Sequence, residues 1–278
     1  MNCEWSALLN IIPIWMRSNV DVIGRACLQE IRMRVGQAPE LICSDRRHQL
    51  QQVLRKEDLE FTVNTASRYS PWAAQTVSKG YITSVGGHRI GICGSAATQN
   101  GDVVSIRDVA SINIRVARQF PNIAISETYM GNILIIGRPG CGKTTLLRDL
   151  IRCRSNSGQT VCVVDERCEL FPIVSNHYCF DTGKRTDVLS GCKKSAGVEM
   201  LLRVMNPDVI AVDEITAQED CKALLEAGWC GVTLLATAHA ASKQDFLSRP
   251  VYQSLVQSKL FSHVILMQPD KSWRTERI

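Results

Sequence analysis

The 278-residue sequence has no apolar run approaching the roughly 18 residues needed to span a bilayer. Near its start it has a short apolar patch at residues 11–16, but neither a basic leader nor a small-residue cleavage site. Its twelve cysteines include no CxxC pair and no matching histidine pattern for zinc. Scattered free thiols in such a chain are typical of a reducing compartment. We expect a cytoplasmic protein with no transmembrane segment.

Charge and aromatic residues are also limited. A net charge of +5 is too small to be the footprint of a nucleic acid or an acidic membrane surface. Aromatic residues make up 6% of the chain and form no cluster with basic residues, which argues against binding of single-stranded nucleic acid. The 45% apolar content fits a globular protein with a full core, and the length suits two domains.

The most informative stretch that is present is residues 137–144, Gly-Arg-Pro-Gly-Cys-Gly-Lys-Thr. A short apolar run at 132–136 precedes it, and residues 145–152 follow with apolar positions at helical spacing. A strand, a Gly-rich loop and a helix form the context of a phosphate-binding P-loop. Lys143 would reach the β- and γ-phosphates of ATP, and Thr144 would hold Mg²⁺. The predicted nucleotide-binding residues are Gly137, Arg138, Pro139, Gly140, Cys141, Gly142, Lys143, Thr144 and Thr145.

Strands alternate with helices from residue 132 onward, which predicts an α/β fold with a parallel sheet. In this part we expect a polar, turn-rich connection over 172–194, a helix over 217–227 closed by Gly228, and edge strands from 264 to the end. The earlier part predicts short strands at 28–36, 39–52, 89–94 and 111–118, and helices at 4–17 (interrupted near Pro13), 56–69 and 71–78. We therefore predict a smaller α+β domain over residues 1–125 and a P-loop domain over residues 126–278.

Ligands of parallel α/β sheets gather at the carboxyl ends of the strands. Besides the strand before the P-loop, three apolar runs end in polar residues, namely Asp165-Glu166, Asp213-Glu214 and Thr237-Ala238-His239. A buried strand would deliver Asp213 to the metal beside Thr144, as in Walker B motifs. Glu214, one residue later, would orient the attacking water and accept its proton. These strand ends predict one hydrolytic site.

Other candidates leave alternatives open. Asp165 and Glu166 either contribute to catalysis, through the water shell of the metal or the nucleophile, or cap the next segment. His239 either contacts the γ-phosphate or satisfies a turn. Arginines that neutralise transition-state charge often come from a neighbouring subunit. The candidate arginines are Arg115, Arg118, Arg185 and Arg203, with Arg115 preferred because it lies near the domain junction.

This order of motifs resembles that of the secretion and pilus-motor ATPases of type II and type IV systems. Those enzymes have a RecA-like core behind a mixed α/β N-terminal domain, and carry a Walker A motif, an Asp box, a Walker B motif and a His box. The matching stretches here are 137–144, 165–169, 208–214 and 237–239. The Asp box lacks the proline of the motors, and Asp213 stands where many of them have glycine.

Further segments are similar to the stage III sporulation AA family, a branch of that superfamily in endospore-forming bacteria. They lie at 30–34, 86–91, 111–115, 164–167, 183–189 and 206–214. The segment 183–189, with Arg-Thr-Asp-Val-Leu at its end, is the most distinctive, because no general P-loop rule requires it. The resemblance implies a Mg²⁺-dependent ATPase, a homo-hexamer, that is recruited to the inner face of a membrane by membrane protein partners. It would energise a secretion-like channel complex during endospore formation.

Three rival interpretations remain. Leu189-Ser190-Gly191 resembles the start of an ABC-type signature and lies 24 residues before Asp213, although Cys192-Lys193 departs from the motif. A RecA-like ATPase acting on nucleic acid shares the same core. A nucleotide-gated scaffold without catalysis would have no use for a base at Glu214.

Overall fold

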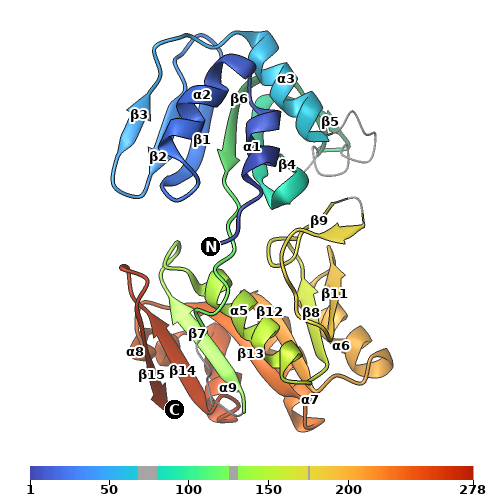
Figure 1. Ribbon diagram of the computed structural model, residues 1–278. Coiled ribbons are helices and arrows are strands. Elements are labelled where there is room, and N and C mark those ends of the chain that lie inside the picture. Colours follow the sequence, from blue (N-terminus) through green and yellow to red (C-terminus); the bar gives the residue numbers. More distant parts are fainter. Residues whose placement is uncertain (68–79, 125–130, 175, 278) are drawn as a thin grey trace. The chain divides into compact units, whose positions relative to one another are not determined.

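The computed structural model describes residues 1–67, 80–124, 131–174 and 176–277. The chain forms two compact units (Figure 1). The first unit contains Met1–Gln119 and Ile173–Phe180, and the second contains Phe120–Pro172 and Asp181–Ile278. The predicted domain boundary near residue 125 and the predicted helix over 71–78 lie outside the described residues. No helix in these described ranges is both long and apolar enough to cross a membrane.

The first unit is an antiparallel sheet, in the strand order β3-β2-β1-β6-β5-β4, with helices packed on it. Its elements are α1 (Trp5–Ile11), α2 (Ile14–Ile23), β1 (Leu28–Arg34), β2 (Glu40–Cys43), β3 (Arg47–Gln49), α3 (Lys56–Ser67), β4 (Tyr81–Thr83), the 3-10 turn η2 (Val85–Gly87), β5 (Arg89–Gln99) and β6 (Asp102–Arg115). Pro13 separates α1 from α2, as predicted. Leu8 and Met16 from the helices share one core with Ile31 and Ile114 from the sheet.

The buried His88, which precedes β5, hydrogen-bonds to the backbone of two other segments. The backbone N–H of Ala117 donates to His88 Nδ1 at 3.1 Å, and His88 Nε2 lies 3.1 Å from the carbonyl oxygen of Glu4. Because a carbonyl only accepts, the ring proton is on Nε2 and the imidazole is neutral. Burial is the largest influence on this ring and lowers the pKa of His88.

The neutral His88 predicts a loss of stability in acid. The unfolded chain takes up a proton at this ring near pH 6.5, whereas the folded chain does not, so stability falls as the pH drops below that value. We expect the melting temperature to fall between about pH 7.5 and 5.5, and to fall less in His88→Gln. Thermal unfolding followed by circular dichroism measures both. The exposed His177→Gln is the control and should keep the wild-type pH dependence. An identical pH dependence in His88→Gln would contradict this assignment.

The second unit is a sheet in the strand order β11-β8-β12-β13-β7-β14-β15, in which every neighbouring pair is parallel except β14–β15. Its strands are β7 (Ile133–Gly137), β8 (Val161–Asp165), β11 (Thr186–Ser190), β12 (Val209–Ile215), β13 (Thr233–His239), β14 (His263–Met267) and β15 (Trp273–Arg277). Its helices are α5 (Lys143–Asn156), α6 (Lys194–Val204), α7 (Gln218–Trp229), α8 (Lys243–Ser248), the 3-10 turn η3 (Pro250–Tyr252) and α9 (Gln253–Gln257). This parallel sheet is the predicted RecA-like α/β core. Its strands β7 and β8 are wholly buried, as strands covered on both faces are, and they bear the P-loop and the Asp box at their ends.

Three details of this unit differ from the sequence-based expectation. The polar stretch 172–194 contains β11 at the sheet edge and a hairpin of β9 (Ile173–Val174) and β10 (His177–Tyr178) that belongs to the first unit. α7 continues past Gly228, where a Cβ would lie 2.5 Å from Leu260 Cδ1, so this glycine serves close packing and does not end the helix. β14 lies between β7 and β15, so of these two predicted edge strands β15 alone lies at an edge.

The placement of β11 also bears on the ABC-type alternative. Leu189 and Ser190 lie inside this strand and pair with Val164 and Asp165 of β8. A signature motif presents its residues at the start of a helix of a separate helical subdomain. The described residues between Lys143 and Leu189 contain α5 as their only helix. The ABC-type interpretation is therefore wrong.

Candidate functional site: a P-loop facing two acidic strand ends

The predicted P-loop joins β7 to α5 at the carboxyl edge of the sheet, and α5 lies against β7 and β13 (Figure 1). Gly140 and Gly142 have φ angles of +78° and +103°, which favour glycine. A Cβ on Gly137 would lie 2.6 Å from Cys141 Sγ, so the close turn also requires glycine there. Such a loop at the start of a helix is the arrangement in which backbone N–H groups can bind an anion. All the predicted nucleotide-binding residues, from Gly137 to Thr145, lie in this loop or the first turn of α5.

The side chain of Lys143 is buried in its own loop. Its Nζ donates to the carbonyl oxygens of Gly137 and Arg138 at 3.0 and 3.1 Å, and lies 2.9 Å from His239 Nδ1. Burial lowers the pKa of Lys143. Because an ammonium only donates, Nδ1 accepts here, and a neutral His239 then carries its proton on Nε2. His239 therefore lies beside the P-loop lysine, as one of the two predictions for it requires.

The carboxylate of Asp213 is held by two hydroxyl groups. Thr144 Oγ1 donates to Asp213 Oδ2 at 2.8 Å, and Thr237 Oγ1 donates to Oδ1 at 2.5 Å. Burial raises the pKa of Asp213, while the hydrogen bonds from Thr237 and Thr144 lower it. The structure thus brings the predicted Walker B carboxylate to the P-loop threonine, across a distance of 69 residues in the sequence.

Glu214 stands at an irregularity of β12. The register of β12 against β13 shifts between Val212 and Ile215, and Glu214 has a φ angle of +55°. Such bulges turn a side chain in a new direction, and a left-handed conformation at a non-glycine residue is strained. The backbone N–H of Glu214 donates to Thr237 Oγ1 at 2.8 Å, which holds this conformation.

Both carboxylate oxygens of Glu214 have partners. His239 Nε2 lies 3.1 Å from Oε1, and Arg167 Nη1 lies 2.6 Å from Oε2. A continuous chain of contacts therefore runs from Lys143 through His239 and Glu214 to Arg167.

The donor set fits magnesium. Mg²⁺ is usually held by one or two protein oxygens, with phosphate and water supplying the rest of its octahedron. Thr144 Oγ1 and Asp213 Oδ2, 2.8 Å apart, are such a pair next to the P-loop. Within the described ranges, no group of three or more His, Cys, Asp or Glu side chains is placed to hold a metal ion by itself. The Thr144–Asp213 pair suits a metal that nucleotide phosphates help to hold.

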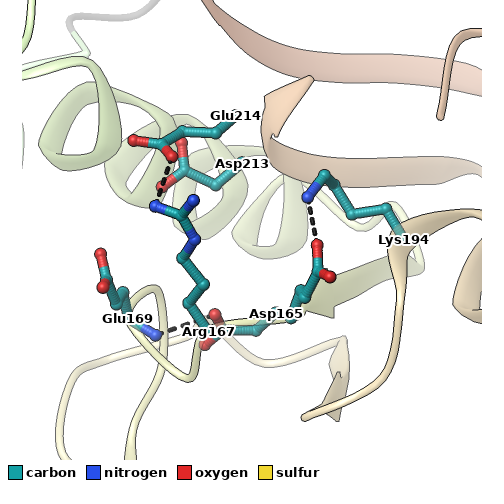
Figure 2. A pocket seen from close by; sticks show the side chains of 7 residues that line it. Asp165, Arg167, Glu169, Lys194, Asp213 and Glu214 are labelled. Atoms are coloured by element: carbon teal, nitrogen blue, oxygen red, sulfur yellow. Dashed lines mark hydrogen bonds and ion pairs between the residues drawn. The ribbon is translucent and has the colours of Figure 1, made fainter. Parts of the chain in front are cut away.

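The Asp box residues have structural partners. Asp165 is buried, and its two oxygens accept the backbone N–H groups of Glu169 and Phe171, each at 2.9 Å. Glu166 forms an ion pair with the buried Lys194, which also lies 3.9 Å from Asp220 Oδ2. Figure 2 shows Asp165, Glu169 and Lys194 around a pocket that Asp213 and Glu214 also line. The contacts of Asp165 favour the alternative in which it shapes the following loop.

Of the two preferred candidate arginines, Arg115 lies in the first unit and Arg185 in the second. Arg185 precedes β11, and its Nη1 donates to the carbonyl oxygen of Gly158, just beyond the far end of α5. The 14 residues of α5 separate that end from the P-loop by about 20 Å. Arg185 therefore makes no described contact with the P-loop of its own chain. Arg115 is exposed at the end of β6 in the first unit.

Comparison with known proteins places this architecture in a family. A family model described as "Sporulation stage III, protein AA" matches residues 8–276. The chain belongs to the stage III sporulation protein AA family. The stage III sporulation protein AA of Bacillus subtilis (strain 168) is 38% identical over 250 residues, which cover 86% of this chain and 81% of that protein.

Solved structures show that this chain shares the fold of an ATPase and of a pilus retraction motor. The Legionella pneumophila ATPase DotB is similar with a TM-score of 0.59 and 20% identity, over 96% of this chain and 80% of that one. The pilus retraction motor PilT, solved with ADP, has a TM-score of 0.60 and 16% identity, over 92% and 78% of the two chains. At these identities the likeness concerns the fold, and the chemistry of this sporulation family member rests on its own residues.

Sequence reasoning did not assign roles to Arg167, Lys194, Thr237 and Arg148, four side chains that shape this site. The buried Arg148 donates to the carbonyl oxygens of Leu170 and Glu169 at 2.7 and 3.0 Å, and burial lowers its pKa to about 10. The Thr-x-His pattern was a usable signal for Thr237. The ion pairs of Arg167 and Lys194 join distant parts of the chain and have no local signal.

The shared hydroxyl of Thr237 predicts a specific loss in Thr237→Val. Valine keeps the shape but leaves the partly buried Asp213 carboxylate without one donor and leaves the backbone N–H of Glu214 without its acceptor. We expect a loss of about 1–3 kcal/mol in unfolding free energy, measured by denaturant titration. Thr237→Ser keeps the hydroxyl and should recover more than half of that loss. Equal destabilisation by valine and serine would assign the effect to packing and contradict this role.

Proposed function

We propose that this chain is a Mg²⁺-dependent ATPase that energises a secretion-like channel complex during endospore formation. The observation that carries the proposal is the hydrogen bond between Thr144 and Asp213, with Glu214 as the next residue. This pairing joins a metal-binding hydroxyl, a metal-binding carboxylate and a candidate base at one P-loop. Membership in a sporulation family and the fold of secretion ATPases support the biological setting.

Each residue of the site has a distinct part in the proposed hydrolysis. Lys143 binds the β- and γ-phosphates, and Thr144 with Asp213 holds Mg²⁺. The metal, when bound, neutralises charge that develops on the phosphate oxygens. Glu214 orients the attacking water and accepts its proton. His239 hydrogen-bonds to both Lys143 and Glu214, and so positions the carboxylate of the base relative to the lysine.

Replacement of the base separates binding from turnover. Glu214→Gln should retain ATP affinity while ATP turnover falls by about 10²–10⁴-fold, because the amide cannot accept the proton. Lys143→Ala should lose both. Phosphate release and fluorescent nucleotide binding measure the two properties. The exposed Glu219→Gln is the matched control and should behave as wild type. Unchanged hydrolysis in Glu214→Gln would remove this residue from the role of base.

We further propose that the active form is a homo-hexamer, in which Arg115 or Arg185 completes the site of a neighbouring copy. Membrane protein partners would recruit this ring to the inner face of a membrane. The exposure of both arginines, and the contact of Arg185 with Gly158 beyond the far end of α5, support action in another subunit.

Nucleotide-dependent assembly tests the ring. In sedimentation velocity experiments with Mg²⁺ and a non-hydrolysable ATP analogue, we expect the 30.9 kDa chain to shift to a hexamer. Arg115→Ala or Arg185→Ala should assemble normally but hydrolyse ATP slowly, which identifies the residue that acts between copies. A monomer under all conditions would contradict the ring. Stimulation of hydrolysis by DNA or RNA would instead favour the RecA-like alternative that acts on nucleic acid.

A further inference from the structure

Arg167 is the cation that contacts the proposed base most closely. It lies in the turn after β8, and its Nη1 is 2.6 Å from Glu214 Oε2. Figure 2 shows the guanidinium directed away from its own loop and toward the end of β12. The side chain of Arg167 is 56% exposed and that of Glu214 only 22%. The arginine is therefore the partner that can leave.

Glu214, by contrast, is fixed on every side. Its backbone N–H is bound by Thr237, and its Oε1 accepts from His239. With Arg167 on Oε2, both carboxylate oxygens are engaged. A general base needs a free lone pair within hydrogen-bond reach of the water that it activates. Each oxygen keeps a second lone pair, but the guanidinium on Oε2 competes with the attacking water for this carboxylate and stabilises its charge, so the base is restrained in this structure.

We propose that Arg167 is a nucleotide-responsive clamp. It holds Glu214 when no γ-phosphate is bound, and it moves to the γ-phosphate of ATP when that group arrives, which frees Oε2. The inference rests on the proposed ATPase function and adds a control step to the same site.

Two physical arguments support the exchange. A terminal phosphate carries more negative charge than a carboxylate and accepts the forked guanidinium through two parallel hydrogen bonds. The chain of contacts from Arg167 through Glu214 and His239 to Lys143 also ends at the residue expected to bind that phosphate. ADP lacks the γ-phosphate, so the clamp closes again after hydrolysis.

Lys194, the other cation of this pocket, is unsuited to the same task. Its side chain is only 5% exposed, and it is held between Glu166 and Asp220. Asp220 in turn accepts the backbone N–H groups of Thr216 and Ala217, which follow β12. Release of Lys194 would therefore disturb the loop after the Walker B strand. For the guanidinium of Arg167, the structure describes one contact, the ion pair with Glu214.

Discrimination between ATP and ADP tests the clamp. In Arg167→Gln we expect the affinity for a non-hydrolysable ATP analogue to fall about tenfold or more, while the affinity for ADP stays at the wild-type value. Arg167→Lys keeps the charge but not the fork and should give an intermediate loss. Arg274→Gln, which breaks an exposed arginine–glutamate pair on β15, is the matched control and should change neither affinity. Equal losses for both nucleotides, or no loss for either, would overturn the proposal.

A double-mutant cycle tests the closed state. Arg167→Gln and Glu214→Ala should be non-additive in melting temperature without nucleotide and with ADP, and additive with the ATP analogue bound, because the pair then no longer exists. Additivity in all three conditions would overturn the clamp. The outcomes also separate the two proposals: a wild-type protein that neither binds nor hydrolyses ATP contradicts the ATPase function, whereas normal turnover with unchanged discrimination in Arg167→Gln contradicts only the clamp.

Discussion

The partly buried carboxylate of Asp213 is the constraint on which the rest of the candidate site depends. A buried carboxylate is costly unless its oxygens accept hydrogen bonds. Here the donors are hydroxyl groups of Thr144 at the start of α5 and Thr237 near the end of β13. Because β13 lies between β7 and β12, one carboxylate joins the P-loop helix, the Walker B strand and the strand between them. The strand order therefore decides which side chains reach Asp213.

The same hydroxyl of Thr237 extends this constraint to Glu214. A left-handed glutamate costs of order 1 kcal/mol and persists only where its neighbours require it. The bond from its backbone N–H to Thr237 supplies that requirement, and contacts with His239 and Arg167 direct the carboxylate. The Asp box and the His box thus meet at Glu214, and the P-loop lysine reaches it through His239. Any group that binds the P-loop phosphate site acts on the base through few intermediate contacts.

Much of the fold follows from local patterns. Alternating strands, apolar parallel strands and the split of the first helix at Pro13 were predictable because each depends on nearby residues. β11 was missed because an edge strand is only half buried and has no continuous apolar run. Gly228 was misinterpreted because its reason is the approach of Leu260, which is distant in sequence. Local spacing carries no information on such contacts.

The sequence by itself determined the P-loop, the acidic ends of β8 and β12, and the family to which the chain belongs, since these are features of adjacent residues. Only the tertiary structure decided which of these side chains meet. In the structure, Asp165 accepts hydrogen bonds from the backbone of the loop that follows it. Arg185 contacts the backbone beyond the far end of α5, and Arg167 forms an ion pair with Glu214. The physical reason is that a strand end fixes a residue's position at the edge of the sheet, whereas its partners depend on strand order, bulges and loop paths set by the whole unit.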